Sequence, residues 1–266
     1  MKKYIFLILC FISVNCLGQN ISICSWNLKD FGKSKSNSEI QFIAKTIMIF
    51  DVVALQEVVA GPGGPQAVAR LADELNRMDS KWDYVISNPT SGFTGSAERY
   101  AFLWKTSKVK KIGESWLSLH YAQEIDREPF FCRFKSKDKI FTIVNYHSIT
   151  KAKHPESEIK YFKFFPGLYS NDNLIFCGDF NLPQSHTVFN PLRKMGYRSV
   201  LVGQKTTLRQ KCIQQGCLAS EFDNFYYNSS FISIVRSGLV EFYRSFPSLR
   251  AARLISDHIP IFAEIK

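Results

Sequence analysis

The sequence predicts an α/β protein in which two packed β-sheets are flanked by helices. Short β-rich apolar runs alternate with segments whose apolar residues recur at helical spacing. The 266 residues are 45% hydrophobic and 14% aromatic, which is enough to bury a large core, and only 21% are charged. Because no internal repeat or low-complexity linker divides the chain, one long domain fits this pattern best.

The N-terminus has the three parts of a secretory signal. Two lysines precede the apolar run 4–14, and small residues follow near Gly18. The run is too short to span a bilayer. We therefore expect residues 1–18 to be a cleaved signal peptide, residues 19–266 to form a single domain, and the protein to be secreted or periplasmic. A buried first strand and a lipid anchor at Cys16 are the alternatives.

Nine short runs rich in β-branched and aromatic residues are predicted to be strands. In chain order they occupy residues 21–24, 52–55, 84–87, 100–104, 130–134, 140–146, 174–177, 225–227 and 259–265.

Apolar residues at helical spacing predict several helices between these strands. The helices cover residues 39–50, 66–77 and 156–168, and a short one follows Asn190. Ser38 is available as the N-cap of the first helix. The segment 61–65, Gly-Pro-Gly-Gly-Pro, is a break that either connects a strand to a helix or forms a flexible rim loop.

The chain is strongly basic. Its formal charge of +11 becomes +9 when residues 1–18 are removed, because they contain two lysines and no acidic residue. A polyanion such as nucleic acid suits this charge, since neutralising phosphates releases counterions. An anionic membrane surface suits it equally, so the charge alone does not decide the partner.

Six polar clusters follow or interrupt the predicted strands, and a folded sheet could bring them to one edge. An edge that gathers amide, carboxylate and imidazole groups would be an active site. The clusters are Ser25-Trp26-Asn27, Leu55-Gln56-Glu57, Glu98-Arg99-Tyr100, Asn145-Tyr146-His147, Gly178-Asp179-Phe180-Asn181 and Ser256-Asp257-His258.

The order and spacing of the six clusters resemble the endonuclease/exonuclease/phosphatase superfamily, most of all its deoxyribonuclease I branch. Arg127-Glu128-Pro129 and the run 98–103 are also similar to that branch. The resemblance covers nearly all of the chain after the leader. It implies a four-layered α/β sandwich, with two mainly antiparallel sheets flanked by helices.

Hydrolysis of a phosphodiester requires neutralised phosphoryl oxygens, an activated water and a stabilised leaving oxygen. Glu57 offers the hard oxygen ligands that Mg²⁺ or Mn²⁺ prefers, and Asn27 beside it could orient metal-bound water or phosphate. The resemblance adds Asp257 to this metal neighbourhood. We expect a divalent cation, Mg²⁺ before Mn²⁺ or Ca²⁺.

The resemblance pairs two histidines with carboxylates on either side of the scissile phosphate. His147 is matched with Glu98, and His258 with Asp223. Which histidine acts as acid and which as base is open. A carboxylate partner fixes the tautomer of a histidine and raises its pKa toward the range for general acid catalysis.

Asp179 and Asn181 alternate about Phe180, so on an extended backbone both would face one way and could hold water and a phosphate oxygen. A tight turn stabilised by Asp179 is the alternative. Asn27 and Asn181 are candidates for phosphate contact. Arg127 matches a phosphate-binding arginine in the resemblance, and an ordinary salt bridge is its alternative.

Five cysteines remain after removal of the leader. Cys24, Cys132 and Cys177 lie in apolar runs and are predicted to be buried core residues. Cys212 and Cys217 lie in a polar segment of an exported chain, and we expect a disulfide that closes this short loop.

Two positions depart from the deoxyribonuclease I pattern. Val59 replaces a phosphate-binding arginine, and Ser96 replaces a tyrosine that packs in the DNA minor groove. Arg99 and the lysine-rich stretch 105–111 are candidates to compensate, although a lysine run is usually a solvated face.

The resemblance implies a secreted, metal-dependent endonuclease that hydrolyses DNA, double-stranded and with low sequence specificity, as a monomer without an obligate protein partner. One alternative is a sphingomyelinase-like phosphodiesterase or a phosphatase that acts on lipid or small phosphate esters. The other is a catalytically silent binding protein.

Overall fold

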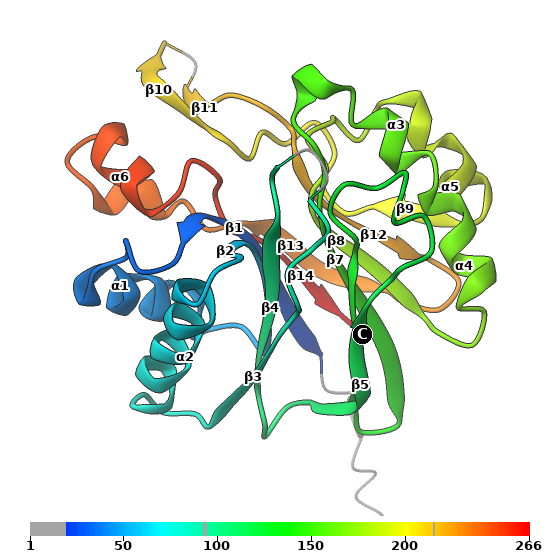
Figure 1. The fold of residues 1–266 in the computed structure, drawn as a ribbon, viewed down its shortest axis with the longest axis horizontal. Coiled ribbons are helices and arrows are strands. Elements are labelled where there is room, and N and C mark those ends of the chain that lie inside the picture. Colours follow the sequence, from blue (N-terminus) through cyan, green and yellow to red (C-terminus); the bar gives the residue numbers. More distant parts are fainter. Residues whose placement is uncertain (1–19, 93–94, 215) are drawn as a thin grey trace, which may run out of the picture.

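Two six-stranded sheets face each other in the computed structural model (Figure 1). The structure describes residues 20–92, 95–214 and 216–266, so the expected signal peptide lies outside the described residues. From edge to edge, the first sheet contains β13 (Ile234–Leu239), β14 (Ile261–Ile265), β1 (Ile21–Phe31), β2 (Val52–Val59), β4 (Glu98–Lys105) and β3 (Trp82–Ile86). The second contains β5 (Lys110–Leu117), β6 (Phe130–Ser136), β7 (Lys139–His147), β8 (Leu174–Asp179), β12 (Asp223–Asn228) and β9 (Tyr197–Ser199).

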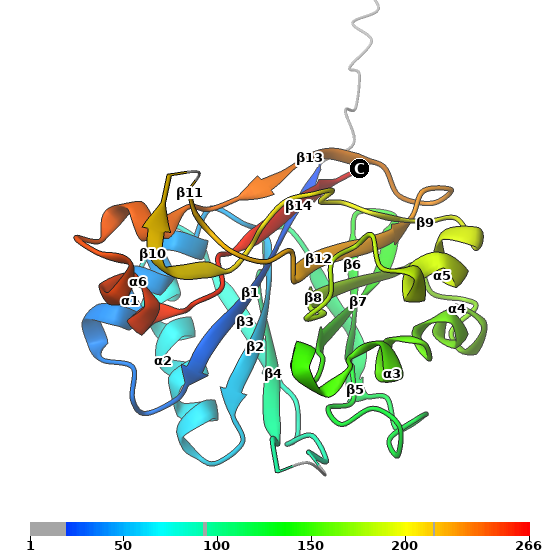
Figure 2. The same ribbon diagram turned by 90° about the horizontal axis from the view of Figure 1, so that it is seen from above.

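Helices cover the outer face of each sheet, which gives the expected four layers (Figure 2). On the first sheet lie α1 (Asn37–Ile47), α2 (Gly63–Asn76) and α6 (Leu249–Ile255). On the second lie α3 (Glu156–Ile159), α4 (Phe165–Leu168) and α5 (Asn190–Lys194). The predicted α/β sandwich is therefore confirmed.

Each sheet is antiparallel except for one parallel pair at its centre. These pairs are β1 with β2 and β7 with β8. Because the carboxyl ends of parallel neighbours meet at the same edge, Asn27 lies beside Gln56, and His147 lies beside Asp179. Antiparallel β12 begins at that edge too, since Asp223 pairs with Asp179. The sheet topology therefore gathers the polar clusters.

Three apolar cores hold the layers together. The core between the sheets includes Phe102, Phe130 and Phe134, which pack in stacked and edge-on pairs. A second core lies between the first sheet and its helices, and a third, rich in aromatic rings, lies between the second sheet and its helices. Burial of a Phe side chain contributes about 1.5–3 kcal/mol, so these cores fix the sheets rigidly beneath the polar edge.

Two helix boundaries differ from the prediction. Ser36, not Ser38, caps α1: its hydroxyl accepts from the amide of Glu39, whose carboxylate accepts in turn from the Ser36 amide. α2 begins at Gly63, so the glycine- and proline-rich segment is partly helical. Gly64 is needed there because a Cβ would overlap the carbonyl of Val59.

The predicted helix over 156–168 is broken into α3, a 3₁₀ turn at Phe162–Phe164 and α4. Pro166 in the first turn of α4 has no N–H to continue the preceding helix. Within this segment Phe162 and Phe165 are buried, and Phe164 is exposed. The break thus turns two aromatic rings into the outer core.

The segment around the predicted disulfide is a hairpin, not a loop. It consists of β10 (Leu208–Ile213) and β11 (Gly216–Leu218), and the Cys212–Cys217 disulfide is confirmed. The three other described cysteines, Cys24, Cys132 and Cys177, are buried free thiols, as predicted. Among the described residues, we find no helix with the length and apolar character needed to cross a membrane.

Candidate active site

The first histidine–carboxylate pair joins the two sheets. His147 ends β7, and Glu98 begins β4 of the opposite sheet. Nδ1 of His147 lies 2.9 Å from Oε2 and 3.1 Å from Oε1 of Glu98. Both residues are buried, and the Tyr100 hydroxyl accepts from the amide of His147. The ring is therefore held in one orientation with Nε2 pointing away from Glu98.

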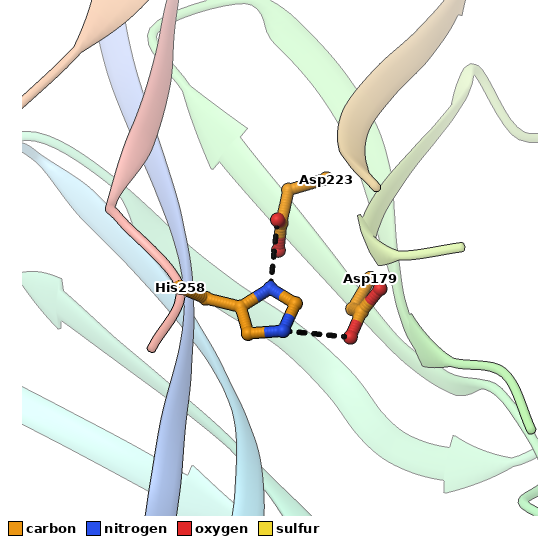
Figure 3. Close-up of side chains that lie close together, drawn as sticks. All are labelled: Asp179, Asp223 and His258. Atoms are coloured by element: carbon orange, nitrogen blue, oxygen red, sulfur yellow. Dashed lines mark hydrogen bonds and ion pairs between the residues drawn. The ribbon is translucent and has the colours of Figure 1, made fainter. Parts of the chain in front are cut away.

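The second pair has the same form. Nδ1 of His258 lies 2.8 Å from Oδ2 of Asp223, and the hydroxyl of Thr206 donates to the same oxygen at 2.6 Å (Figure 3). The amide of His258 donates to the Ser256 hydroxyl, which itself donates to the backbone oxygen of Asn27. These contacts fix the segment that follows α6 against β1.

Asp179 lies between the two pairs. Its Oδ2 is 3.4 Å from Nε2 of His147 and 3.5 Å from Nε2 of His258 (Figure 3 shows the His258 contact). The side chain is almost completely buried at the end of β8. Two histidines that each have a carboxylate behind them thus converge on one central carboxylate.

The charges of this cluster reinforce one another. Burial alone lowers the pKa of His258, but the carboxylates of Asp223 and Asp179 outweigh it and raise the pKa to about 10. Burial also opposes the charged form of His147, yet Glu98 raises its pKa above the ordinary value. Burial favours protonation of Asp179, but the two imidazolium rings hold its pKa below the usual range. The cluster therefore favours two cationic rings around an ionised Asp179.

Asn181 is brought to Asp179 by a turn, not by an extended backbone. Its φ of 51° is left-handed, and its amide donates to Oδ1 of Asp179 at 2.9 Å. Phe180 is buried in the outer core, as expected. The Nδ2 group of Asn181 lies 3.5 Å from Oδ2 of Asp179, so the two side chains face the same cavity although the turn was the alternative prediction.

Glu57 also has a left-handed backbone, with a φ of 59°. It lies in an irregularity of β2, where the pairing with both β1 and β4 shifts register. A non-glycine residue in such a conformation costs about 1–3 kcal/mol and is typical of functional sites. The shift turns Glu57 toward the groove lined also by Asp257 and His258.

The residues predicted to hold a metal present mainly oxygen donors. The Asn27 amide donates to Glu57 at 3.0 Å and to Asp179 at 3.2 Å, so it brings both carboxylates close. Its Oδ1 is buried and has no hydrogen-bond partner among the described residues. A divalent cation beside Glu57 would give this oxygen a partner, and carboxylate and amide oxygens are the ligands Mg²⁺ prefers. The donor set fits a hard divalent cation.

Asp257 lines the same groove but is less tightly placed. Its Oδ2 accepts from Arg253 at 3.0 Å, and its side chain is one-third exposed. Asp179, Asp223 and His258 form another set of possible metal ligands. Their ligand atoms lie within 4.8 Å of one another. A cation bound there would have to displace the proton of His258, because a ligating histidine is neutral.

Arg127 is buried at the junction of the first pair. Its Nε donates to the backbone oxygen of His147 at 3.0 Å, and its Nη1 to Glu98 at 3.2 Å, while its Nη2 donates to the backbone oxygen of Ser148. Arg127 also lines the groove, where a substrate phosphate would lie. Its contact with phosphate stays a prediction. The geometry shows in addition that it positions Glu98 and His147.

The structure identifies supporting residues for which no role was predicted. Thr206 orients Asp223, but the polar residues around Thr206 in the sequence form no motif that would predict this role. Gln56 and Asn145 lie within the polar clusters and are buried; the Gln56 amide donates to Asn145, which donates to the backbone oxygen of Leu55. These bonds connect the sheets beneath the groove.

The candidate compensating cations do not reach the site. Val59 and Ser96 line the groove, as the departures from the pattern predict. The stretch 105–111 begins where β4 ends, so it lies about 23 Å from Glu98 at about 3.3 Å per residue. Arg99 donates to the backbone oxygens of Ala60 and Ser87. This arginine therefore braces the rim of the groove.

A four-layered sandwich with these groups at one edge defines a protein of the deoxyribonuclease I-like fold class. The chain belongs to the endonuclease/exonuclease/phosphatase family, whose model matches residues 12–258.

Curated relatives agree with this assignment. A deoxyribonuclease from Thioalkalivibrio sp. is 27% identical over 200 residues, which cover 70% of this chain and 53% of that protein. Deoxyribonuclease gamma from Rattus norvegicus is 26% identical over 273 residues, which cover 91% of this chain and 83% of that protein. The chain thus spans about half the length of the Thioalkalivibrio relative.

Solved structures show the same fold. An endonuclease/exonuclease/phosphatase family protein from Bacteroides thetaiotaomicron matches with a TM-score of 0.65 at 15% identity, over 93% of this chain and 97% of that one. At this identity the likeness shows the fold alone.

Proposed function

We propose that the protein is an exported, metal-dependent endonuclease that hydrolyses DNA with little sequence preference. The observation that carries this proposal is the convergence of two carboxylate-paired histidines on Asp179. Phosphodiester hydrolysis needs a group for the attacking water and a proton for the departing oxygen, and this cluster offers both within one groove.

Each residue has a role that follows from its position. Asp179 faces both Nε2 atoms and is suited to orient the attacking water and accept its proton. A histidine kept cationic by its carboxylate donates a proton to the departing oxygen, and the other cationic ring attracts the phosphate. Asn181 and Asn27 point amide groups at the same cluster and are suited to hold a phosphate oxygen.

A divalent cation held by Glu57, Asn27 and Asp257 would supply positive charge to the phosphoryl oxygens. The protein residues complete this task by bringing the donors together: Asn27 bridges Glu57 and Asp179, and the amide of Asp30 donates to the second oxygen of Glu57 at 3.2 Å. We propose Mg²⁺ because the donors are hard oxygens.

DNA is the proposed substrate for two reasons. The curated relatives are named deoxyribonucleases, and the net charge of +11 suits a polyanion. We propose action as a monomer, because the catalytic groups all come from one chain, and duplex DNA as the substrate, because the resemblance implies it. An exposed disulfide favours an oxidising compartment, and a signal peptide over residues 1–18 would deliver the chain there.

Plasmid nicking tests the proposal. The mature chain is incubated with supercoiled plasmid in Mg²⁺ or in EDTA, beside His147→Ala and the matched control His154→Ala. His154 is exposed and pairs only with Glu156 among the described residues, so its replacement should leave nicking unchanged. We expect Mg²⁺-dependent nicking that falls about 10²–10⁴-fold in His147→Ala.

An intact plasmid would overturn the proposal. Turnover of sphingomyelin vesicles or small phosphate esters by the same preparation would then support a phosphodiesterase or phosphatase. Val59 in the groove favours this second candidate, because it removes a cation that duplex binding would use. A protein inactive on all of them would be a binding protein.

A further inference from the structure

The β10–β11 hairpin stands directly beside His258. Thr207 forms a bridge with His258, and the amide of Leu208 donates to the backbone oxygen of Asp257 at 2.7 Å. From there the hairpin projects past the catalytic edge, at the top of Figure 1. Thr207 and Leu208, at the start of the hairpin, thus contact residues of the active site, and Lys211 lies further along β10.

A depression of about 540 Å³ runs along this hairpin. Asp257 and His258 line both this depression and the catalytic groove. The two hollows are therefore neighbours that share these residues as a wall. A polymer held at His258 would meet the depression along β10 next.

The depression is positively charged. Arg209, Lys211 and Arg253 line it, against a single acidic residue, Asp257. Arg253 is already engaged with Asp257 and with the backbone oxygen of Leu208. Arg209 has only its Nε bonded, to the backbone oxygen of Leu218, and within the described part of the chain its Nη groups and the exposed Lys211 have no hydrogen-bond partner. Two cations thus remain available for a ligand.

The hairpin is held in place before any ligand binds. Leu208 pairs with Leu218, and the disulfide connects Cys212 to Cys217 near the tip. Arg253 of α6 ties the start of β10 to the body of the protein. A hairpin whose backbone is already ordered loses less conformational entropy on binding, so more of the attraction between its charges and phosphate contributes to affinity.

We propose that this hairpin is a substrate-binding arm for the phosphate backbone of the polymer beyond the scissile phosphate, with Arg209 and Lys211 as its contacts. The inference rests on the proposed function. Lys211 lies four residues along the strand from Thr207, or about 13 Å. That distance matches about four nucleotides of one DNA strand. The arm supplies on the His258 side the cationic contact that Val59 lacks on the Glu57 side.

Lysine and arginine contacts to phosphate carry no sequence information, so the arm should increase affinity without base preference. They should also make binding depend on salt. Loss of two phosphate contacts decreases the magnitude of the negative slope of log affinity against log salt by about 1.8.

The test compares wild type with Arg209→Ala/Lys211→Ala and with the control Arg77→Ala/Lys81→Ala. The control removes two exposed cations that precede β3 in the chain. Trp82, the first residue of β3, pairs with Lys105, and Lys105 is at the opposite end of β4 from Glu98. The control positions are therefore remote from the catalytic groove. Duplex binding in EDTA and duplex cleavage in Mg²⁺ are measured over a range of salt concentrations. Cleavage of the small diester bis(p-nitrophenyl) phosphate, which has no phosphate beyond the scissile one, reports the catalytic residues.

We expect the arm variant to bind duplex about tenfold more weakly, to show the lower salt slope, and to have a higher KM for duplex with little change in kcat. Its rate on the small diester should equal that of wild type, whereas a misfolded protein would lose both activities. Equal duplex affinity and salt slope in the arm and control variants would overturn the inference. Arm-dependent binding without cleavage by wild type would support the arm and overturn only the proposed endonuclease function.

Discussion

Asp179 shows how much the site depends on single side chains. Among the described residues, it is the one carboxylate that contacts the Nε2 atoms of both histidines, and it is held there by the amides of Asn27 and Asn181. Each histidine can approach it correctly only because a second carboxylate holds the opposite ring nitrogen. The outer carboxylates are therefore as important for the geometry as the histidines themselves.

Replacement of Glu98 tests this at the first pair. Glu98 raises the pKa of His147, so the cationic ring persists to higher pH than an isolated histidine. Glu98→Gln should lower that pKa, move the alkaline limb of the kcat/KM profile to lower pH, and decrease kcat/KM about 100-fold. The measurement is a pH–rate profile of plasmid nicking.

Glu156→Gln is the matched control, because Glu156 pairs with His154 at the surface and should leave the profile unchanged. An alkaline limb that does not move in Glu98→Gln would show that His147 is not the group that titrates.

At this scale the sequence predicted which residues meet but not how they are held. The contacts between His147 and Glu98 and between His258 and Asp223 were expected from the family resemblance, and the structure places both. The turn at Asn181 was only an alternative, because a short segment after a strand does not reveal its φ. Thr206 could not be predicted, because its contact to Asp223 crosses 17 positions of irregular chain and hairpin.

Among the elements, the hairpin and its disulfide give a direct prediction. Closing this short loop is worth about 2 kcal/mol by the loop-entropy model. Reduction should therefore make residues 211–218 more susceptible to trypsin, with faster cleavage after Lys211. The measurement is limited proteolysis of the mature chain with and without reductant, followed by mass spectrometry.

Cys212→Ser/Cys217→Ser provides the comparison, since its digestion should be fast and independent of reductant. The remaining described cysteines are free thiols, so reductant acts on no other bond among them. Identical digestion of the oxidised and reduced protein would contradict the prediction.

The strands that were not predicted show where prediction from the hydrophobic pattern fails. All nine predicted strands occur, and they include the parallel centres of both sheets. Apart from the hairpin, the missed strands β5, β9 and β13 are all at a sheet edge. Edge strands face solvent more and need less apolar alternation, as the half-exposed residues of β5 show. The centre of a sheet can therefore be predicted from hydrophobic pattern, and its edges much less well.

The whole molecule depends on a polar connection between its two sheets. Gln56 of the first sheet and Asn145 of the second are buried and hydrogen-bonded to each other under the groove. Asn145 also donates to the backbone oxygens of Leu55 and Ala101. These bonds fix the distance between the sheets, and hence between Glu98 and His147.

Asn145→Ala should remove the buried hydrogen bonds to Gln56, Leu55 and Ala101 and decrease the free energy of unfolding by about 1–3 kcal/mol. The measurement is denaturant unfolding at neutral pH. Asn173→Ala, at an exposed site where the amide donates to Ile140, should change stability by less than about 0.5 kcal/mol. Equal midpoints for the two variants would show that the connection is not structural.

The buried thiols have a consequence for how the chain acquires its disulfide. Before the sheets pack, the thiols of the five cysteines that follow residue 18 are exposed and compete for oxidation. Cys212 and Cys217 are only five positions apart, so they encounter each other faster than any distant pair. Packing then removes Cys24, Cys132 and Cys177 from exchange, because burial raises their pKa, that of Cys132 to about 12, and suppresses the reactive thiolate. Packing of the two sheets thus leaves Cys212 and Cys217 as the described cysteines that can pair.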